Sequence, residues 1–181
     1  MYSALRISLS LLILFLFTQV QFHVPIFFIG IPITGQSFAI LLLPYIFGLR
    51  EGITSILLYL LLGLVGVHVL AQGGHGVDAF LSNSGGYLIG FIFGGAFSGF
   101  ISNNKVNNLK NAFLGMFIGT LIILIFGVFK LSFDIGISKA IEYGFKPFVL
   151  GGVIKVVVGA FAGWLIKKYI MILDFNFDSN L

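Results

Sequence analysis

Long apolar runs separated by short polar or turn-forming breaks make up most of the chain. An apolar stretch of about 20 residues crosses the ~30 Å hydrocarbon core of a bilayer as a helix. Six runs predict helices at approximately residues 3–22, 36–49, 51–70, 85–103, 110–131 and 147–170. The break "GLRE" at 48–51 is so short that we expect a tight helical hairpin or a kinked helix there. The pattern predicts an all-α membrane protein, a single domain over residues 1–181 with six transmembrane helices.

The composition supports this prediction. Of 181 residues, 59% are hydrophobic and 9% are charged, and the mean hydropathy is +1.12. Typical soluble domains carry about 25% charged residues, and a soluble domain of this size leaves roughly a third of its surface in water. The chain is therefore expected to have the lipid bilayer as its solvent. The absence of cysteine excludes disulfides and thiolate metal sites.

The basic residues lie at the edges of the apolar runs and form no patch, and the net charge is only +4, which argues against a nucleic-acid partner. Cytoplasmic segments of membrane proteins carry an excess of Lys and Arg. With both termini in the cytoplasm, the basic residues inside are Arg6, Arg50, Lys105, Lys110, Lys167 and Lys168. Outside are Lys139 and Lys146, balanced by Asp134 and Glu142, with Lys130 near the outer end of the fifth helix. The charge distribution thus predicts cytoplasmic N and C termini.

The first apolar run would also fit a cleaved signal peptide, because Arg6 precedes an apolar stretch of suitable length. No small-x-small cleavage motif precedes His23. We therefore expect the first run to remain as a transmembrane helix.

Two segments predicted on the outer side contain no Lys or Arg: "HVPIFFIGIPITGQ" at 23–36 and "AQGGHGVDAFLSNSGG" at 71–86. Both are rich in residues that break regular structure, and glycine lets a ligand approach the backbone closely. Irregular backbone near membrane depth is tolerated where it is buried in protein or lines a cavity. We expect the two loops to cap a ligand pocket that faces outward. The alternative is that they are flexible surface loops.

The stretch "GGVIKVVVGAFAG" at 151–163 places Lys155 inside an apolar span. With the last helix starting near Pro147, eight residues put this lysine about 12 Å below the outer end, and a charge at such depth suggests function. Gly151, Lys155, Gly159 and Gly163 recur every four residues and share one close-packing helix face. We expect Lys155 to point into the bundle and to contact a ligand. The alternative is a lysine satisfied by backbone carbonyls or water.

Catalytic chemistry has little support in the sequence. No carboxylate lies within a span to pair with Lys155, which argues against a proton relay or an acid–base pair. His75 and Asp78 in "HGVD" could form a dyad or a weak metal site. "GGHG" lacks the following Lys-Ser/Thr of a phosphate loop, so we expect no ATP hydrolysis by this chain. No metal or cofactor is expected.

Four motifs, in this order, resemble the BioY family: "IPITGQSFAILL", "FGLREGITSILLYLLLGLVGVHVLAQGGHG", "SGGYLIGF" and "PFVLGGVIK". This family is the biotin-binding S component of energy-coupling factor (ECF) transporters. The resemblance implies high-affinity biotin binding and uptake across a bacterial or archaeal cytoplasmic membrane, through a pocket under the two outer loops. It also implies the S-component fold and a transmembrane T component and two ATPase subunits as partners. The chain itself would be no enzyme.

The resemblance also assigns residues to the pocket. Lys155 matches the binding lysine, and Gln36 matches the glutamine that follows the first outer loop. Gly74 belongs to the glycine-rich loop with Gly73 and Gly76, and Gly86 and Tyr87 match the start of the fourth helix.

Two departures concern the substrate. Gly152 stands where the family has an aspartate, and Ser82 and Asn83 replace the Gly-Pro of the second loop. The biotin ureido ring has two N–H donors and one carbonyl acceptor, and a buried donor left unpaired costs about 1–3 kcal/mol, or roughly one to two decades of affinity. Asn83, Ser84 or Gln36 could supply the missing acceptor.

Two alternatives stay open at this point: an S component for a different small vitamin or carboxylate, and an intramembrane enzyme that uses His75 and Asp78. The T-component interface is expected to be built from small residues on the first helix. Ala4 and Ser8 form the small-xxx-small pair at its start.

Overall fold

The computed structural model describes residues 2–22, 33–103 and 107–178, in which helices are joined by short connections. The long helices are α1 Tyr2–Gln19, α2 Gln36–Phe47, α3 Leu49–Leu64, α5 Gly85–Ser102, α6 Leu109–Ile135 and α8 Lys146–Asp178. The short elements are strands β1 Gln21–Phe22 and β2 Ile33–Thr34, the 3₁₀ turn η1 Ala71–Gly73, and helices α4 Gly76–Leu81 and α7 Ile137–Gly144. The two strands pair antiparallel, with Gln21 opposite Thr34.

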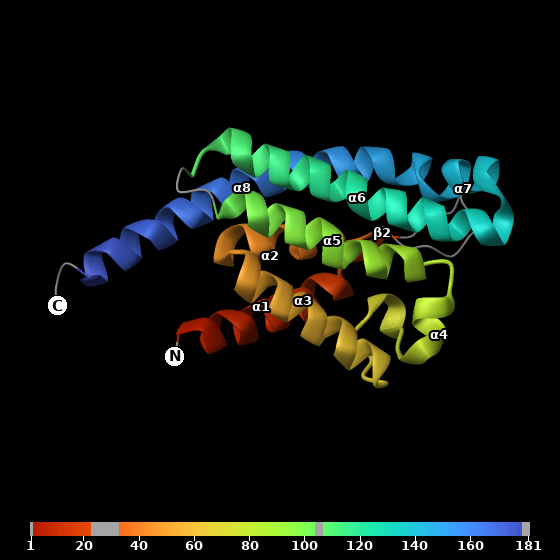
Figure 1. Cartoon of the computed structure of the whole chain (residues 1–181), viewed down its shortest axis with the longest axis horizontal. Helices are drawn as coiled ribbons and strands as arrows, with labels where there is room; N and C mark the ends of the chain where they lie inside the picture. Colours follow the sequence, from red (N-terminus) through yellow and green to blue (C-terminus); the bar gives the residue numbers. More distant parts are fainter. Residues whose placement is uncertain (1, 23–32, 104–106, 179–181) are drawn as a thin grey trace.

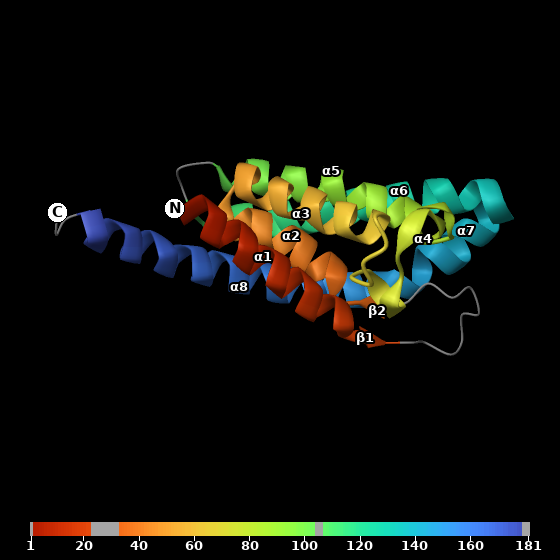
Figure 2. The same cartoon turned by 90° about the horizontal axis from the view of Figure 1, so that it is seen from below.

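Helix α5 lies at the centre of the bundle, where it packs against α6 on one side and against α2 and α3 on the other. Helix α8 runs along α6 and α2, and α1 packs on α2 and α3. Both ends of the chain lie at one end of the molecule, and α4 and α7 lie at the other (Figure 1). The C-terminal part of α8 extends well beyond the other helices (Figure 2).

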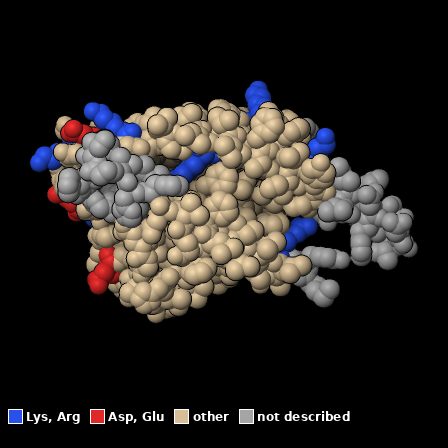
Figure 3. Space-filling model, turned by 180° about the vertical axis from the view of Figure 1, so that it is seen from behind, with Lys and Arg blue, Asp and Glu red and all other residues tan. Residues whose placement is uncertain are grey.

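The surface fits a lipid environment. Three helices are long and apolar enough to cross a membrane, namely α5, α6 and the part of α8 from Lys146 to Met171, while α1 and α2 contain shorter apolar helices. Many large hydrophobic side chains of α1, α3, α6 and α8 are exposed. Figure 3 shows that uncharged residues cover most of one face, and that the acidic side chains visible there gather at the end where α4 and α7 lie. The chain is a multi-pass membrane protein.

The predicted helices appear with shifted ends, and two predicted loops are partly helical. The third helix ends at Leu64 instead of residue 70, because Val65 and Gly66 turn the chain. The segment 71–84 contains η1 and α4, so the expectation of an irregular loop was wrong there. The segment 132–146 contains the end of α6 and the whole of α7. Helix α7 buries Ala140 and Gly144, which lie four residues apart on one face. The sequence did not predict this helix, because its short buried face is interrupted by polar residues.

The predicted hairpin between the second and third helices is confirmed. Gly48 alone separates α2 from α3, and its φ of 94° lies in the region that favours glycine. A Cβ atom added at Gly52 would lie 2.4 Å from the Cα of Pro44, so the two helices pack backbone to backbone just beyond the turn. Helix α2 is nearly enclosed by its neighbours, since most of its residues are buried.

Glycines on α5 allow its close approach to α6. Gly86, Gly90 and Gly94 recur every four residues and face α6. A Cβ atom at Gly86 would lie 2.5 Å from the carbonyl oxygen of Phe126, and one at Gly94 would lie 2.8 Å from that of Gly119. Any side chain at these positions would push the two helices apart.

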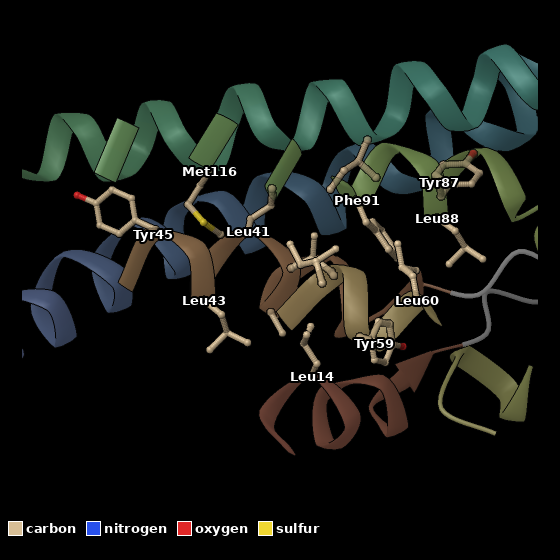
Figure 4. Close-up of a cluster of buried hydrophobic side chains, with 14 of the residues drawn as sticks. Leu14, Leu41, Leu43, Tyr45, Tyr59, Leu60, Tyr87, Leu88, Phe91 and Met116 are labelled. Atoms are coloured by element: carbon tan, nitrogen blue, oxygen red, sulfur yellow. The ribbon is translucent and has the colours of Figure 1, made fainter. Parts of the chain in front are cut away.

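The opposite face of α5 packs on α2 through small residues and hydroxyl groups. Ser98 Oγ donates a hydrogen bond of 2.7 Å to the carbonyl oxygen of Leu41, and Ser102 Oγ donates to that of Tyr45. Pro44 has no N–H to offer the carbonyl of Ile40, and Gly95 of α5 lies against that carbonyl. The apolar core that fills the space between these helices is drawn in Figure 4.

We predict that Gly90→Ala destabilises the protein, because the new Cβ atom would lie 2.9 Å from the Cα atom of Ile123 on α6. Overpacking of this kind typically costs about 1–3 kcal/mol. The measurement is the thermal unfolding midpoint in detergent. Ile89→Ala, at a side chain of the same helix that is 46% exposed, is the matched control and should change the midpoint less. Equal midpoints for the two variants would contradict the prediction.

Candidate functional site

A cavity of about 370 Å³ opens among α2, α5, α6 and α8, with the segment 70–84 on one side. This volume falls in the range of about 300–1,000 Å³ that is typical of small-molecule sites. The polar lining residues are Thr34, Gln36, Ser37, Gln72, Ser82, Asn83, Ser84, Thr120 and Lys155. The remaining ones are Leu41, Leu70, Ala71, Gly74, Ala79, Tyr87, Leu88, Phe91, Ile123, Leu124, Phe148 and Gly152.

The lining follows the helical repeat. Helix α5 contributes Tyr87, Leu88 and Phe91, α6 contributes Thr120, Ile123 and Leu124, and α8 contributes Phe148, Gly152 and Lys155. Residues three or four positions apart lie on the same helix face, so each helix presents one face to the cavity. The wall is mostly apolar, and its polar groups are concentrated near β2, the start of α2 and the loop before α5.

Among the lining residues that the structure describes, Lys155 is the one with a charge. It lies nine positions after the first residue of α8, Lys146, or about 14 Å along the helix. Its Nζ atom donates hydrogen bonds to the carbonyl oxygen of Thr34 (2.6 Å) and to Oγ of Ser37 (3.0 Å). The lysine thus links α8 to β2 and to the first turn of α2, and one of its three N–H groups is left for another partner.

Gln36 belongs to a buried hydrogen-bond network centred on Tyr59. Gln36 Nε2 donates to the Tyr59 hydroxyl over 2.7 Å, and this hydroxyl donates to the carbonyl oxygen of Val69 over 2.9 Å. Thr18 Oγ1 lies 2.8 Å from the same hydroxyl. The network joins α1, α2 and α3 to the backbone just before Leu70 and so holds one edge of the cavity in place.

Tyr87 and Gly86 are neighbours in the sequence but have different surroundings. The Tyr87 ring lines the cavity and lies 5.7 Å from the Phe148 ring between centroids, while its hydroxyl donates over 2.6 Å to the carbonyl oxygen of Gly144. Tyr87 therefore offers a ligand its ring surface. Gly86 lies outside the cavity lining and packs against α6. The expectation that Gly86 contacts the substrate finds no counterpart in the cavity.

The segment 65–76 has a backbone that requires glycine. Gly66, Gly73 and Gly76 have φ values of 102°, 69° and 71°, in the region that favours glycine. Gly74, between them, lines the cavity.

The His75 ring lies against that of His68, with 3.7 Å between ring centroids and a tilt of 40° between the ring planes, and its Nδ1 atom lies 3.0 Å from the carbonyl oxygen of Gly73. Within the described residues no hydrogen bond joins His75 to Asp78, and no group of three His, Asp or Glu side chains could hold a metal. The geometry therefore gives no support to a His75–Asp78 dyad or to a metal site there.

The loop before α5 supplies further polar groups to the lining of the cavity. Asn83 and Ser84 both line it, as does Ser82, whose Oγ donates to the carbonyl oxygen of Ala79 and accepts from the backbone N–H of Ser84. Within the described residues, the Asn83 carboxamide has no hydrogen-bond partner. Asn83 is thus available to a ligand as donor and as acceptor.

Gly152 lies in the cavity wall with space in front of it. A Cβ atom there would meet only Cγ2 of Thr120, at 3.5 Å, which is an ordinary contact. A side chain at this position would fill part of the cavity without disturbing the backbone.

Sequence reasoning missed four polar lining residues: Thr34, Ser37, Gln72 and Thr120. Ser37 adjoins Gln36, so the resemblance pointed close to it. Thr120 could have been found only by knowing which face of α6 meets Gly152, since a lone threonine in an apolar run carries no pattern of its own.

Comparisons with known proteins agree with this geometry. The sequence model of the BioY family matches residues 2–171. The biotin transporter BioY of Thermotoga maritima is 37% identical over 139 residues, which are 76% of this chain and 82% of that protein. The biotin transporter BioY of Rhizobium etli is 35% identical over 146 residues, covering 75% and 78% of the two chains.

A crystal structure of the S-component for biotin from an ECF-type ABC transporter superposes with a TM-score of 0.83. The sequence identity is 24%, and the match covers 92% of this chain and 91% of that one. The all-helical fold is therefore that of the ECF S component.

We predict that Tyr59→Phe destabilises the protein by about 1–3 kcal/mol, because it leaves the buried carbonyl of Val69 and the amide of Gln36 without a partner. Hydrogen exchange at residues 65–74 should also become faster, since that backbone loses its link to α3. The measurements are the thermal midpoint and hydrogen–deuterium exchange in detergent. Tyr169→Phe, at a residue that is 61% exposed, is the control. Unchanged exchange at residues 65–74 would show that the network does not hold the segment.

Proposed function

Because the chain belongs to the BioY family, we propose that it binds biotin in the cavity around Lys155, as the substrate-binding S component of an ECF transporter. The single observation that carries this proposal is an S-component fold with a cavity whose described lining has one cation and no other charged side chain. Transport would run across a bacterial or archaeal cytoplasmic membrane. The partners would be a T component and two ATPase subunits, since this chain has no phosphate loop of its own.

The chemistry of the wall suits biotin. The ureido ring of biotin carries a carbonyl oxygen that can accept a hydrogen bond from the remaining N–H of Lys155. The thioether ring and the aliphatic chain of biotin can pack on Leu88, Phe91 and Ile123. Aromatic rings from Tyr87 and Phe148 extend this apolar surface. An apolar pocket with a few fixed polar groups is the usual design of a small-molecule site.

The elements around the mouth support a capture role. Lys155 donates a hydrogen bond to the carbonyl oxygen of Thr34 in β2, and the Tyr59 hydroxyl donates one to the carbonyl oxygen of Val69. The first outer loop lies largely outside the described residues, but the strand that ends it is tied to the proposed ligand anchor. Gln36 acts in this proposal through Tyr59, while Gly74 and Asn83 contact the ligand directly from the segment 70–84.

We propose that α1, α2, α3, α5, α6 and α8 cross the membrane within a single domain, with both termini in the cytoplasm. Helix α2 has only 12 residues, about 18 Å at 1.5 Å per residue, which is shorter than the ~30 Å hydrocarbon core. Its short crossing is shielded, because its neighbours enclose it and little of it would meet lipid.

The partner interface is proposed on α1. Ala4 and Ser8 are both exposed and lie one turn apart on this helix. Small residues at this spacing allow close helix–helix contact in membranes, and a T-component helix could pack there.

A different small vitamin or carboxylate remains the second candidate ligand, because the described cavity lining contains no carboxylate to accept a ureido N–H. Competition of labelled biotin with a panel of vitamins and small carboxylates separates the two candidates. Displacement by unlabelled biotin at the lowest concentration supports the first, and stronger displacement by another compound supports the second.

We predict that Lys155→Ala weakens biotin binding by roughly one to two decades, because a hydrogen bond from a charged donor contributes about 1.5–3 kcal/mol. Isothermal titration of the protein in detergent measures it. Lys139→Ala on the exposed side of α7 removes the same charge far from the cavity and should bind as the wild type does. Unchanged affinity in Lys155→Ala would refute the role of this lysine, and no binding by the wild type would refute the biotin assignment.

The topology is tested with single cysteines, which the chain otherwise lacks. Ser138→Cys on α7 and Lys110→Cys at the start of α6 are both exposed positions at opposite ends of α6. A membrane-impermeant maleimide should label Ser138→Cys in intact cells and Lys110→Cys only after permeabilisation. The reverse pattern would invert the proposed orientation.

A further inference from the structure

The cavity has donors in excess at the end where Lys155 lies. Lys155 has one N–H left for a ligand, and Ser37, whose oxygen accepts from Lys155, keeps its own hydroxyl proton to donate. Gln36 already donates to Tyr59. No Asp or Glu is among the lining residues that the structure describes. A ligand that also carries N–H groups therefore needs a neutral acceptor at this end.

Thr120 meets this requirement. Its Oγ1 atom donates over 2.7 Å to the carbonyl oxygen of Met116, one turn earlier in α6. A threonine hydroxyl has one proton and two lone pairs, so once the proton is committed to Met116 the oxygen can only accept. Threonine in a helix commonly takes the rotamer that makes this bond.

The position of Thr120 is also suitable. Its Cγ2 atom lies 3.5 Å from where a Cβ of Gly152 would be, so the threonine faces the lining residue of α8 that has no side chain. Gly152 lies three residues before Lys155 on the same helix, and both line the cavity. The glycine leaves room for a ligand ring to approach Thr120 while its carbonyl group reaches Lys155.

Two other oxygen atoms of this end are already engaged. The carbonyl of Thr34 accepts from Lys155, and the hydroxyl of Tyr87 donates to Gly144. Asn83 has free capacity, but it belongs to the loop before α5, whereas Thr120 and Gly152 lie on neighbouring faces of α6 and α8. Within the described residues, the side-chain carbonyl of Gln36 also accepts no hydrogen bond, because the bond to Tyr59 uses Nε2. Asn83 and Gln36 are thus the competing acceptors that an experiment must separate from Thr120.

We propose that Thr120 is a specificity-determining residue whose Oγ1 accepts a hydrogen bond from a ligand N–H, while Lys155 donates to the adjacent ligand carbonyl. The site would then recognise a neutral N–H and C=O pair of the ligand, as in a cyclic urea, with the Thr120 hydroxyl oxygen as the acceptor for the N–H. This inference rests on the proposed biotin function and specifies which group of the ligand lies between α6 and α8.

The test is titration of biotin, and of an analogue N-methylated on the ureido ring, against Thr120→Val and Thr120→Ser. Valine keeps the shape of threonine and removes the acceptor, so biotin affinity should fall about tenfold, as expected when a buried donor loses its partner. Serine keeps the hydroxyl and should stay within about twofold. The preference of the wild type for biotin over the methylated analogue should shrink in Thr120→Val, a change that a purely structural role would not produce.

Thr120→Val that binds biotin as tightly as the wild type would overturn the inference. An equal loss of affinity for biotin and for the methylated analogue would also overturn it, because that result indicates altered packing. A tenfold loss in Asn83→Ala together with no loss in Thr120→Val would assign the acceptor to Asn83 instead. If the wild type binds no biotin, it is the proposed function that fails, so the two failures are distinguishable. The thermal midpoint of each variant reports whether it is folded.

Discussion

The close approach of α5 to its neighbours is the constraint on which the site depends. In a bilayer the hydrophobic effect does not drive helices together, and association relies on packing and on interhelical hydrogen bonds. Gly86 and Gly94 bring the backbone of α5 against that of α6, and Ser98 bonds α2 on the other side. These contacts fix the rotation of α5 about its own axis. They therefore also fix the direction in which Tyr87 and Phe91, four residues apart on one face of α5, point. The shape of the cavity wall therefore depends on the close packing of the α5 glycines against α6.

The second constraint is that polar groups inside the bundle need partners. Lys155 donates two of its N–H groups to Thr34 and Ser37, and the hydroxyl of Tyr59 bonds to Gln36 and Val69. Each pair joins elements that are far apart in sequence at the edge of the cavity. Since an unpaired polar group is most costly in a medium without water, these few bonds fix the mouth more firmly than the same bonds would at a soluble surface. Some residues of the proposed ligand site therefore also form the hydrogen bonds that hold the surrounding elements together.

The sequence predicted the long helices well because apolar length is a strong signal, and α5, α6 and α8 lie where the apolar runs were. It failed for α7, whose eight residues form an amphipathic turn at the surface that is too short for a span and too polar to stand out. The placement of Lys155 in the cavity could be anticipated because a charge within an apolar span has few alternatives.

The assignments of Gly86 and Thr120 show why the rest of the site was out of reach. Successive residues on a helix point about 100° apart, so Gly86 turns to α6 while its neighbour Tyr87 turns to the cavity. Thr120 looks like any hydroxyl that bonds its own helix. Only the pairing of helices reveals what each of these residues faces, and pairing is a property of the three-dimensional arrangement.

The two hydrogen bonds of Lys155 to Thr34 and Ser37 have an energetic consequence. A cation already shared between a strand and a helix has only part of its hydrogen-bonding capacity left for an incoming molecule, so contact with the aromatic and aliphatic wall would supply a large share of the binding free energy. Burial of that apolar area would appear in calorimetry as a negative change in heat capacity. In the proposed complex, Lys155 would orient the ligand and the apolar wall would add to its affinity.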